Sequence, residues 1–448
     1  MREEVTAKRI SIIGGGLAGA LNAVYLGSKG YVVDVYESKS DIRTSIKYGG
    51  RSINLALSAR GLAALEKVGL SKMIKDVGIP MPGRIVHHIN GKTSYMAYGK
   101  KGEYLLSISR SNLNKELLTA AEKLPNVTIH CEHKLIDLDV DNSKLTFNVN
   151  DLSEKQVYAD VIFGNDGANS IVRKQLMKRM RINYTQEFID HGYKEISMPP
   201  KNDNYAMDPN GLHIWARQTF MMIALPNKDK SFTCTLFLPF KSFDEIKTKE
   251  DILAFFQKEF PDSIPLYGEE HLINEYFSNP VGSMISIKCD PYHFEDKVIF
   301  FGDAAHAMVP FFGQGMNSAL EDVRVFHGLL DEVHDNFGLA MKEFTEKRNK
   351  DAKAICDLSM QNYIEMRSHV TFKTFIIKKR VDNCLHWLMP NTFIPKYSMV
   401  SFTLIPYHEV VERALWQDKI IFGVTKLVGL FSLAFGVLLA RKIHVRLS

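Results

Sequence analysis

Residues 9–19 read RISIIGGGLAG, an apolar run that ends in a glycine-rich turn. The run predicts a short strand, and the residues after the glycines predict an apolar helix over about Leu17–Lys29. A second strand is expected over 31–37 (YVVDVYE). Because a strand, a helix and a strand in this order pack as a parallel unit, the sequence predicts an α/β fold.

The glycines of this turn suit the phosphates of a nucleotide. Gly14 permits the tight turn, Gly16 lets the backbone approach a pyrophosphate, and Gly19 lets the helix pack closely on the strand. The helix N-terminus adds free N–H groups and a positive dipole end. Glu37 ends the second predicted strand, where its carboxylate can accept hydrogen bonds from ribose hydroxyls. Together these features predict nucleotide binding.

Two later stretches extend the pattern. Residues 164–170 (GNDGANS) follow an apolar strand and contain Asp166, although an ordinary turn would explain them on their own. Residues 302–306 (GDAAH) place Asp303 at the end of another strand, where it can accept from a ribityl hydroxyl of a flavin. Residues 313–317 (GQGMN) lead into a helix whose first N–H groups would face the flavin edge that becomes anionic on reduction.

His306 is a candidate base in the third stretch. No nearby residue in the sequence would orient it as a catalytic group, so a structural role is favoured.

In this order and spacing, the three stretches resemble the signature of flavoprotein aromatic hydroxylases of the para-hydroxybenzoate hydroxylase type, over residues 8–340. The resemblance implies that FAD is bound and that NADPH reduces it as a transient co-substrate. We expect noncovalent binding, because the sequence offers phosphate and ribose contacts and no clear flavinylation motif. O₂ then adds to give a C4a-hydroperoxide, whose distal oxygen passes to an activated aromatic ring. No second Gly-x-Gly-x-x-Gly follows, in agreement with a family that binds its nicotinamide without a separate Rossmann domain.

The expected architecture is α/β (α+β overall), with a Rossmann-like FAD-binding domain interleaved with an antiparallel β-sheet substrate domain. Aromatic and β-branched runs such as HIWARQTFMMIAL (213–225) predict the second sheet. The expected units are an FAD-binding domain over 1–185 completed by 291–340, a substrate domain over 186–290, a helical region over 341–416 and a transmembrane helix over 420–440.

Four segments resemble the kynurenine 3-monooxygenase family more closely: RSINLALS (51–58), SRSNLN (109–114), VPFFGQG (309–315) and NYIEM (362–366). This resemblance implies FAD contacts beside the fingerprint residues Gly14, Gly16, Gly19, Asp166 and Gly315, from Ala18, Glu37, Ala56, Arg110, Leu135, Asp303, Met316 and Asn317. It implies a substrate site in which an amino-acid carboxylate contacts Arg84, Tyr98, Asn362 and Tyr397, and the ring lies against Leu212, Ile223 and Phe311. A visible departure is Gly211, at the start of the second sheet.

The implied reaction is hydroxylation of L-kynurenine at ring position 3, a step of tryptophan catabolism. The ring amino group activates the ortho carbon and, unlike a phenol, needs no deprotonation. We therefore assign no catalytic base.

On the residues alone, Arg84 and Tyr98 have two equally good interpretations. They form a carboxylate clamp, because a guanidinium matches a carboxylate, or they are an exposed arginine and a packed tyrosine. The segments 84–89 and 94–98 predict a hairpin. A three-residue loop over 90–92 sets Arg84 opposite Tyr98 on one face, whereas a two-residue loop would put Tyr98 on the other face.

Residues 420–440 (IIFGVTKLVGLFSLAFGVLLA) carry a single charge, Lys426, near their start. At about 1.5 Å per residue, such a helix spans roughly 31 Å, which matches the hydrocarbon thickness of a bilayer. Trp416 and Lys419 flank it as interface anchors would. We expect a membrane anchor in preference to a buried helix, with the enzyme facing the cytosol. The resemblance implies the mitochondrial outer membrane.

The composition also bears on nucleic-acid binding, disulfides, metal sites and secretion. A net charge of +5 without a dense basic stripe does not indicate a nucleic-acid partner. The five scattered cysteines predict neither a disulfide framework nor a metal site. No secretory signal is expected at the N-terminus.

Two other functions stay open. One is a hydroxylase or epoxidase of the same superfamily that acts on a phenol or a membrane lipid, although a lipid needs no carboxylate clamp. The other is a flavin-loaded membrane scaffold without turnover, which the intact stretches 302–306 and 313–317 disfavour.

Overall fold

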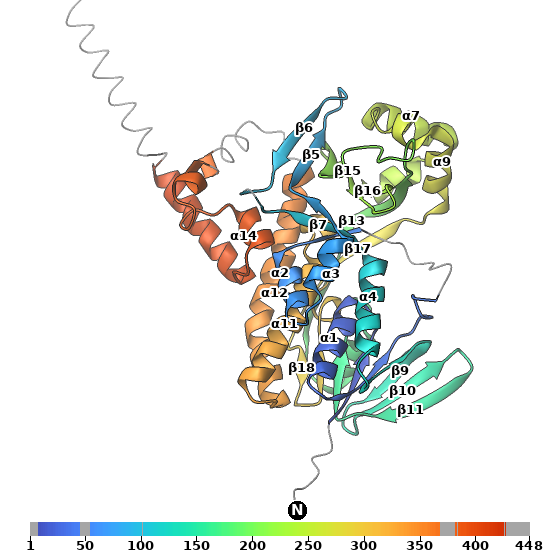
Figure 1. Ribbon diagram of the computed structural model, residues 1–448, viewed down its shortest axis with the longest axis vertical. Helices are drawn as coiled ribbons and strands as arrows, with labels where there is room; N and C mark the ends of the chain where they lie inside the picture. Colours follow the sequence, from blue (N-terminus) through green and yellow to red (C-terminus); the bar gives the residue numbers. More distant parts are fainter. Residues whose placement is uncertain are drawn as a thin grey trace, which may run out of the picture.

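The computed structural model of the protein describes residues 8–44, 54–100, 102–367, 381–382, 384–424 and 426 (Figure 1). Its first layer is a six-stranded sheet with the strand order β18-β19-β12-β1-β2-β8. The strands are β1 (Arg9–Ile13), β2 (Val32–Tyr36), β8 (Val127–His130), β12 (Val161–Gly164), β18 (His293–Phe294) and β19 (Val298–Phe300). All neighbours are parallel except β18 and β19, so the predicted parallel α/β unit is confirmed.

The three glycine-rich stretches follow neighbouring strands of this sheet. β19, β12 and β1 lie side by side, although they come from distant parts of the chain. Because parallel strands end at the same edge of a sheet, the turns that begin after Ile13, Gly164 and Phe300 meet there.

Helices cover this sheet and tie its parts together. α1 (Leu17–Ser28) contacts α4 (Arg110–Glu122) and α11 (Gly315–Glu332), and α11 also packs on α2 (Ala59–Glu66) and on the long α12 (Phe337–Arg367) (Figure 1). The remaining elements of this half are α3 (Ser71–Val77), α5 (Ile171–Arg179), α10 (Asp303–His306) and the 3₁₀ turn η1 (Pro310–Phe312).

Two small sheets flank these helices. One has the order β3-β7-β4, from β3 (Asn54–Leu57), β7 (Leu105–Ser109) and β4 (Ile79–Met81). The other has the order β11-β10-β9, from β9 (His133–Asp139), β10 (Lys144–Val149) and β11 (Ser153–Tyr158). In Figure 1, β9–β11 lie at the opposite end of the molecule from β5 and β6.

The second large layer is a seven-stranded sheet with the order β17-β13-β16-β15-β14-β5-β6. Its strands are β5 (Gly83–His87), β6 (Thr93–Ala97), β13 (Asn183–Met198), β14 (Leu212–Arg217), β15 (Phe220–Pro226), β16 (Phe232–Pro239) and β17 (Gly282–Asp290). The predicted, mostly antiparallel sheet is present, with one parallel contact between β14 and β5. The hairpin β5–β6 thus extends this sheet, although in the sequence it lies among elements of the half that is built on the six-stranded sheet (the flavin half).

Four helices interrupt the second sheet and were not predicted: α6 (Phe240–Glu245), α7 (Lys249–Glu259), α8 (Ile264–Tyr267) and α9 (Glu269–Ser278). They cover one face of the sheet, where Ile252 and Phe256 pack in the same buried cluster as Trp215 and Met222. A capping box between Thr248 and Asp251 begins α7 and is the local signal that marks it.

The hairpin differs from the expected register. Arg84 pairs with Met96, because the loop lies one residue earlier than predicted: the His88 N–H donates to the Lys92 carbonyl, and Gly91 has a φ of +76°. The expectation that Arg84 and Tyr98 are directly opposite is therefore wrong. Tyr98 follows Met96 by two residues, so the two side chains still share one face of the hairpin.

The C-terminal part lies against the flavin half. α14 (Lys396–Phe402) packs on α2, and residues 407–424 form a further helix. The predicted transmembrane helix over 420–440 lies outside the described residues, apart from 420–424 and 426. Among the described helices, none is both long enough and apolar enough to span a bilayer.

Candidate flavin and substrate sites

A cleft of about 1060 Å³ opens where β1, β2 and β12 end. The predicted FAD residues that line it are Gly14, Gly16, Glu37, Arg110, Leu135 and Asp166. They come from the sheet edge, from the start of α4 and from β9, so three elements enclose one cleft. Its volume is at the upper end of the range for sites that hold small molecules and cofactors, which suits a dinucleotide.

The glycine turn gives this cleft its shape. A Cβ on Gly14, whose φ is +101°, would lie 2.4 Å from the Asn165 carbonyl oxygen, and a Cβ on Gly19 would lie 1.9 Å from the Gly14 oxygen. Neither position tolerates a side chain. A Cβ on Gly16 would meet nothing within 4 Å, so the backbone there faces open space. This is the arrangement that lets a pyrophosphate approach the N–H groups at the start of α1.

Glu37 stands beside the same turn. One carboxylate oxygen accepts from the Gly15 N–H at 2.8 Å, and the other accepts from the Lys39 N–H at 2.9 Å. The side chain therefore holds the glycine turn against the end of β2 in addition to facing the cleft. Its predicted contact with ribose stays a prediction.

Asn165 and Asp166 bring to the cleft polar atoms that no described residue pairs with. Asp166 Oδ2 accepts from the N–H groups of Ile171 (2.6 Å) and Val172 (3.1 Å), and burial raises the pKa of this carboxyl group. Its Oδ1 and both side-chain polar atoms of Asn165 are buried, with no hydrogen-bond partner among the described residues. Buried polar atoms are costly unless they are paired, so these atoms fit a polar ligand such as FAD.

The other predicted FAD residues gather around α10 and α11. Asp303 begins α10 with an exposed side chain, and Gly315 and Met316 begin α11. A Cβ on Gly302 would lie 3.9 Å from Ala18 Cβ, so the start of α10 adjoins the glycine turn of α1. The backbone that leads into Asp303 therefore lies beside the first turn of α1, next to the cleft.

Asn317 is buried and contacts backbone atoms on two elements. Its Nδ2 donates to the carbonyl oxygens of Ala56 (2.9 Å) and Gly313 (2.8 Å), and its Oδ1 accepts from the Ser58 N–H at 2.8 Å. Asn317 thereby fixes β3 to the loop before α11. Its predicted flavin contact is untested.

Arg84, Tyr98 and Tyr397 form a compact group at the base of the hairpin β5–β6. The Arg84 guanidinium carbon lies 4.4 Å from the centre of the Tyr397 ring and 5.3 Å from that of Tyr98, and the two rings stack at 5.3 Å. Arg84 Nε and the Tyr98 hydroxyl are buried without hydrogen-bond partners among the described residues. Burial raises the pKa of Tyr98, so its hydroxyl stays protonated and can donate. A buried cation beside a free donor suits a carboxylate.

An apolar region adjoins this clamp. Leu212 and Ile223 contact both the cluster that contains Phe311 and the cluster next to Tyr98. Phe311 stacks on Tyr363 with ring centres 4.1 Å apart. The predicted ring-pocket residues therefore lie together. Tyr363, which belongs to the segment NYIEM (362–366) but was not predicted to line the pocket, packs with them.

Asn362 belongs to the same region. Its Nδ2 donates to the Phe311 carbonyl at 2.7 Å, which connects α12 to η1. Of the four residues predicted to bind a carboxylate, Arg84, Tyr98 and Tyr397 thus lie together. The fourth, Asn362, lies beside Phe311 in the apolar region.

The FAD binding domain family matches residues 7–357 of this chain. Kynurenine 3-monooxygenase of Sus scrofa is 51% identical over 93% of this chain and 89% of that protein. The enzymes of the same name from Anopheles gambiae and Caenorhabditis elegans are 46% and 42% identical, over 93% and 96% of this chain and 86% and 98% of theirs. The chain belongs to the kynurenine 3-monooxygenase family. It is an FAD-dependent monooxygenase.

Solved structures share the fold of this kynurenine 3-monooxygenase family member. The tetrameric 2-methyl-3-hydroxypyridine-5-carboxylic acid oxygenase superposes with a TM-score of 0.67 at 19% identity, covering 88% of this chain and 96% of that one. PqsL of P. aeruginosa, in complex with 2-aminobenzoylacetate, has a TM-score of 0.68 at 19% identity, covering 83% and 100%. At this level of identity the likeness establishes the fold alone.

The family resemblance had one visible departure, Gly211. A Cβ on Gly211 would lie 2.6 Å from Ile85 Cδ1, so the glycine lets the chain before β14 lie tightly against β5. The departure therefore brings Leu212 close to the strand that carries Arg84.

The face of β5 opposite the clamp holds a polar cluster that sequence reasoning missed. His87 lies 2.6 Å from Asp262 Oδ2 and 2.8 Å from His213, and His213 Nε2 lies 2.8 Å from the Asp208 carbonyl oxygen. A carbonyl only accepts, so His213 carries its proton on Nε2. Burial lowers the pKa of His213 to about 4, which keeps it neutral. The cluster ties β5 to β14 and so supports the strand of Arg84.

Proposed function

We propose that this protein hydroxylates L-kynurenine at ring position 3, with bound FAD, with NADPH as a transient reductant and with O₂. The observation that carries the proposal is the clamp: Arg84 and Tyr98 bring buried donors, unpaired among the described residues, to one end of the apolar region around Phe311, in a chain of the kynurenine 3-monooxygenase family. L-Kynurenine has an α-carboxylate at one end and an aminophenyl ketone at the other, so its two ends match these two surfaces.

The clamp residues bind and orient. Arg84 would pair with the carboxylate, Tyr98 would donate a hydrogen bond to it, and the Tyr397 ring would hold the guanidinium in place. Leu212, Ile223 and Phe311 would bury the ring and exclude water from it. No residue has to remove a proton from the ring amine, so no base is assigned.

The cleft at the sheet edge would hold FAD. The open backbone at Gly16, the start of α1, and the unpaired atoms of Asn165 and Asp166 support this assignment. When bound, FAD supplies the electron transfer and the oxygen activation. Asp303 and the N-terminus of α11 would place its ring next to the substrate wall.

We also propose that the chain is anchored in the mitochondrial outer membrane by residues 420–440, with the enzyme on the cytosolic side. The support is the sequence: 21 residues with one charge, which the helix over 407–424 enters. The choice of membrane rests on the family resemblance.

One experiment tests the activity. The full chain is purified in detergent, its flavin spectrum is recorded, and NADPH oxidation is followed with L-kynurenine and with a panel of phenols and isoprenoids. We expect acceleration by L-kynurenine, with 3-hydroxykynurenine as the product. Acceleration by a phenol or an isoprenoid alone would indicate another hydroxylase, and a flavin that NADPH and every substrate fail to bleach would indicate a scaffold.

A further inference from the structure

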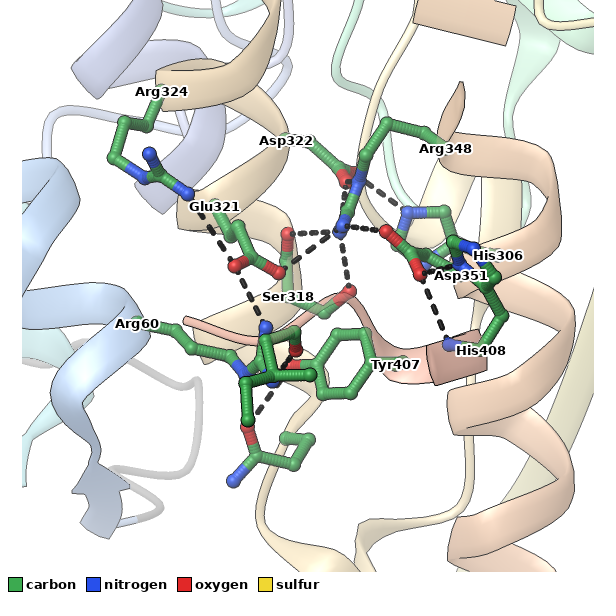
Figure 2. Close-up of polar contacts among 12 residues, drawn as sticks. Arg60, His306, Ser318, Glu321, Asp322, Arg324, Arg348, Asp351, Tyr407 and His408 are labelled. Atoms are coloured by element: carbon green, nitrogen blue, oxygen red, sulfur yellow. Dashed lines mark hydrogen bonds and ion pairs between the residues drawn. The ribbon is translucent and has the colours of Figure 1, made fainter. Parts of the chain in front are cut away.

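A buried network of charged and polar side chains joins α2, α11, α12 and the C-terminal segment (Figure 2). Its members are Arg60, His306, Ser318, Glu321, Asp322, Arg324, Arg348, Asp351, Tyr407 and His408. His306 belongs to it through a 2.6 Å contact between Nε2 and Asp322 Oδ2, so its orienting partner lies on the next α-helix, α11. The proposed reaction uses none of these residues, and their cost of burial calls for a role.

Arg60 is the member that reaches the C-terminal segment. Its side chain is 0% exposed, and each of three nitrogens donates to a different acceptor. Nη1 contacts Glu321 Oε1 at 2.8 Å, Nε contacts the Val400 carbonyl at 2.9 Å, and Nη2 contacts the Ile405 carbonyl at 2.5 Å. Because the last carbonyls of a helix have no partner within it, Arg60 caps the C-terminus of α14.

The helix that Arg60 caps carries a residue of the clamp. Tyr397 lies one turn before Val400 in α14, and its ring stacks on Tyr98 at 5.3 Å and on Phe312 of η1 at 5.5 Å. Any shift of α14 along its axis would therefore move Tyr397 relative to Arg84.

The same arginine also reaches the loop before α11. Its guanidinium carbon lies 3.8 Å from the centre of the Tyr407 ring, and the Tyr407 hydroxyl donates to Gln314 Oε1 at 3.0 Å. Gln314 directly precedes Gly315, at the N-terminus of α11 where the flavin ring is expected. Burial raises the pKa of Tyr407, which keeps its hydroxyl a donor.

Arg348 makes this arrangement rigid. Its guanidinium contacts Glu321 at 3.1 Å, Asp322 at 2.7 Å and Asp351 at 3.1 Å. Glu321 is thus held between two buried arginines, and Arg60 cannot move without separating the pair. Such a network specifies one geometry, because any displacement leaves a buried charge unpaired.

We propose that Arg60 is a positioning residue. It holds Tyr397 of the clamp in place through α14, and through Tyr407 it holds Gln314 in the loop before α11. The expected change in the KM for L-kynurenine rests on the proposed function. The expected change in the mobility of α14 does not. Arg60 touches neither substrate nor cofactor. It acts through α14 and through the loop before α11.

The test is Arg60→Lys in the full-length holoenzyme, with Arg324→Gln as the matched control. Lysine keeps the charge next to Glu321 but has one nitrogen, so it cannot serve three separated acceptors. Arg324 contacts the same Glu321 oxygen at 3.5 Å and makes no hydrogen bond to the C-terminal segment among the described residues. We expect Arg60→Lys to raise the KM for L-kynurenine about tenfold and to release more hydrogen peroxide per NADPH. FAD content and the KM for NADPH should stay within about twofold of wild type.

Hydrogen–deuterium exchange of residues 396–405 provides a readout that needs no substrate. Faster exchange in Arg60→Lys than in wild type and Arg324→Gln supports the inference, and unchanged exchange overturns it. If wild type fails to hydroxylate L-kynurenine, the proposed function fails while the exchange result still decides the role of Arg60. A KM for L-kynurenine equal to that of Arg324→Gln would overturn the link to the clamp.

Tyr407→Phe covers the case in which Arg60→Lys does not fold. It removes only the hydroxyl that contacts Gln314. We expect hydrogen peroxide release to rise while the KM for L-kynurenine changes less than about twofold, because α14 keeps its cap. A wild-type amount of hydrogen peroxide per NADPH in this variant would overturn the link between Arg60 and the loop before α11.

Discussion

Replacing Arg84 by methionine tests the clamp most directly. Methionine keeps the length and the apolar stem of the side chain and removes the charge, so Tyr98 and Tyr397 keep a packing partner. In the substrate complex, the lost contact is that of a guanidinium with a desolvated carboxylate. Truncating one partner of such a pair costs about 2–5 kcal/mol. The expected decrease in kcat/KM is therefore roughly 30- to several-thousand-fold.

The free enzyme should respond differently. Arg84→Met loses cation–π contacts with two tyrosine rings, worth about 0.5–2 kcal/mol. It also removes the buried Arg84 Nε, which has no hydrogen-bond partner in the described part of the chain. An unpaired buried donor destabilises a protein by about 1–3 kcal/mol. The two effects have opposite signs and similar size, so the thermal unfolding temperature should change little. Stabilisation of the protein by L-kynurenine should be lost.

The assay measures NADPH consumption, 3-hydroxykynurenine and hydrogen peroxide in parallel. A misplaced ring cannot accept oxygen, so peroxide per NADPH should rise in Arg84→Met along with the KM for L-kynurenine. For an analogue of L-kynurenine that lacks the carboxylate, wild type and Arg84→Met should have similar values of kcat/KM. Arg179→Met, which removes an exposed arginine paired with Asp141, serves as a control. A near-normal kcat/KM of Arg84→Met for L-kynurenine would refute the clamp.

Three further predictions concern other parts of the chain. Glu37→Ala and Asp303→Ala should each lower flavin occupancy, because each removes a charged acceptor worth about 1.5–3 kcal/mol; full occupancy by absorbance in both variants would contradict these roles. A chain cut after Trp416 should enter the soluble fraction with its flavin spectrum, and pelleting with membranes after a high-salt wash would reveal a second attachment surface. The low pKa of His213, about 4 against an ordinary 6.5, means that the unfolded chain binds a proton that the folded one does not; stability should therefore fall as the pH decreases from about 6.5 to about 4, by up to roughly 3 kcal/mol, and His213→Gln should flatten this dependence in thermal unfolding.

The flavin half was predictable because its signals are local. Gly14, Gly16 and Gly19 encode a turn whose geometry depends on residues within the same few positions, and β1, α1 and β2 begin and end within two residues of the expected bounds. The second sheet was recognisable from its aromatic runs, but the helices over 240–278 were not. These helices keep aromatic residues like those of the strands, and the capping box at Thr248 is a local signal that marks the start of α7.

The substrate site could not be built from patterns of residues. Arg84 and Tyr397 lie more than three hundred positions apart in the sequence, and only the resemblance to known enzymes linked them. The hairpin register depended on whether the loop began at Ile89 or Asn90, a choice that hydrophobic alternation does not decide. Arg60 and Val400 are 340 positions apart, so the contact that carries our further inference gave no sequence signal at all.

The placement of β5 and β6 in the second sheet has a consequence for synthesis. The chain adds β1 and β2 to the six-stranded sheet, then adds β5 and β6 to the seven-stranded sheet. It returns to the first sheet for β8 and β12, leaves again for β13 to β17 and comes back for β18 and β19. During synthesis, the second edge of β12 therefore stays uncovered until β19 (Val298–Phe300) has emerged from the ribosome. Neither sheet can complete early as an independent unit, and long strand edges stay exposed until about two thirds of the polypeptide has emerged. The protein should accordingly depend on chaperones during translation, and its two halves should not fold when they are expressed as separate fragments.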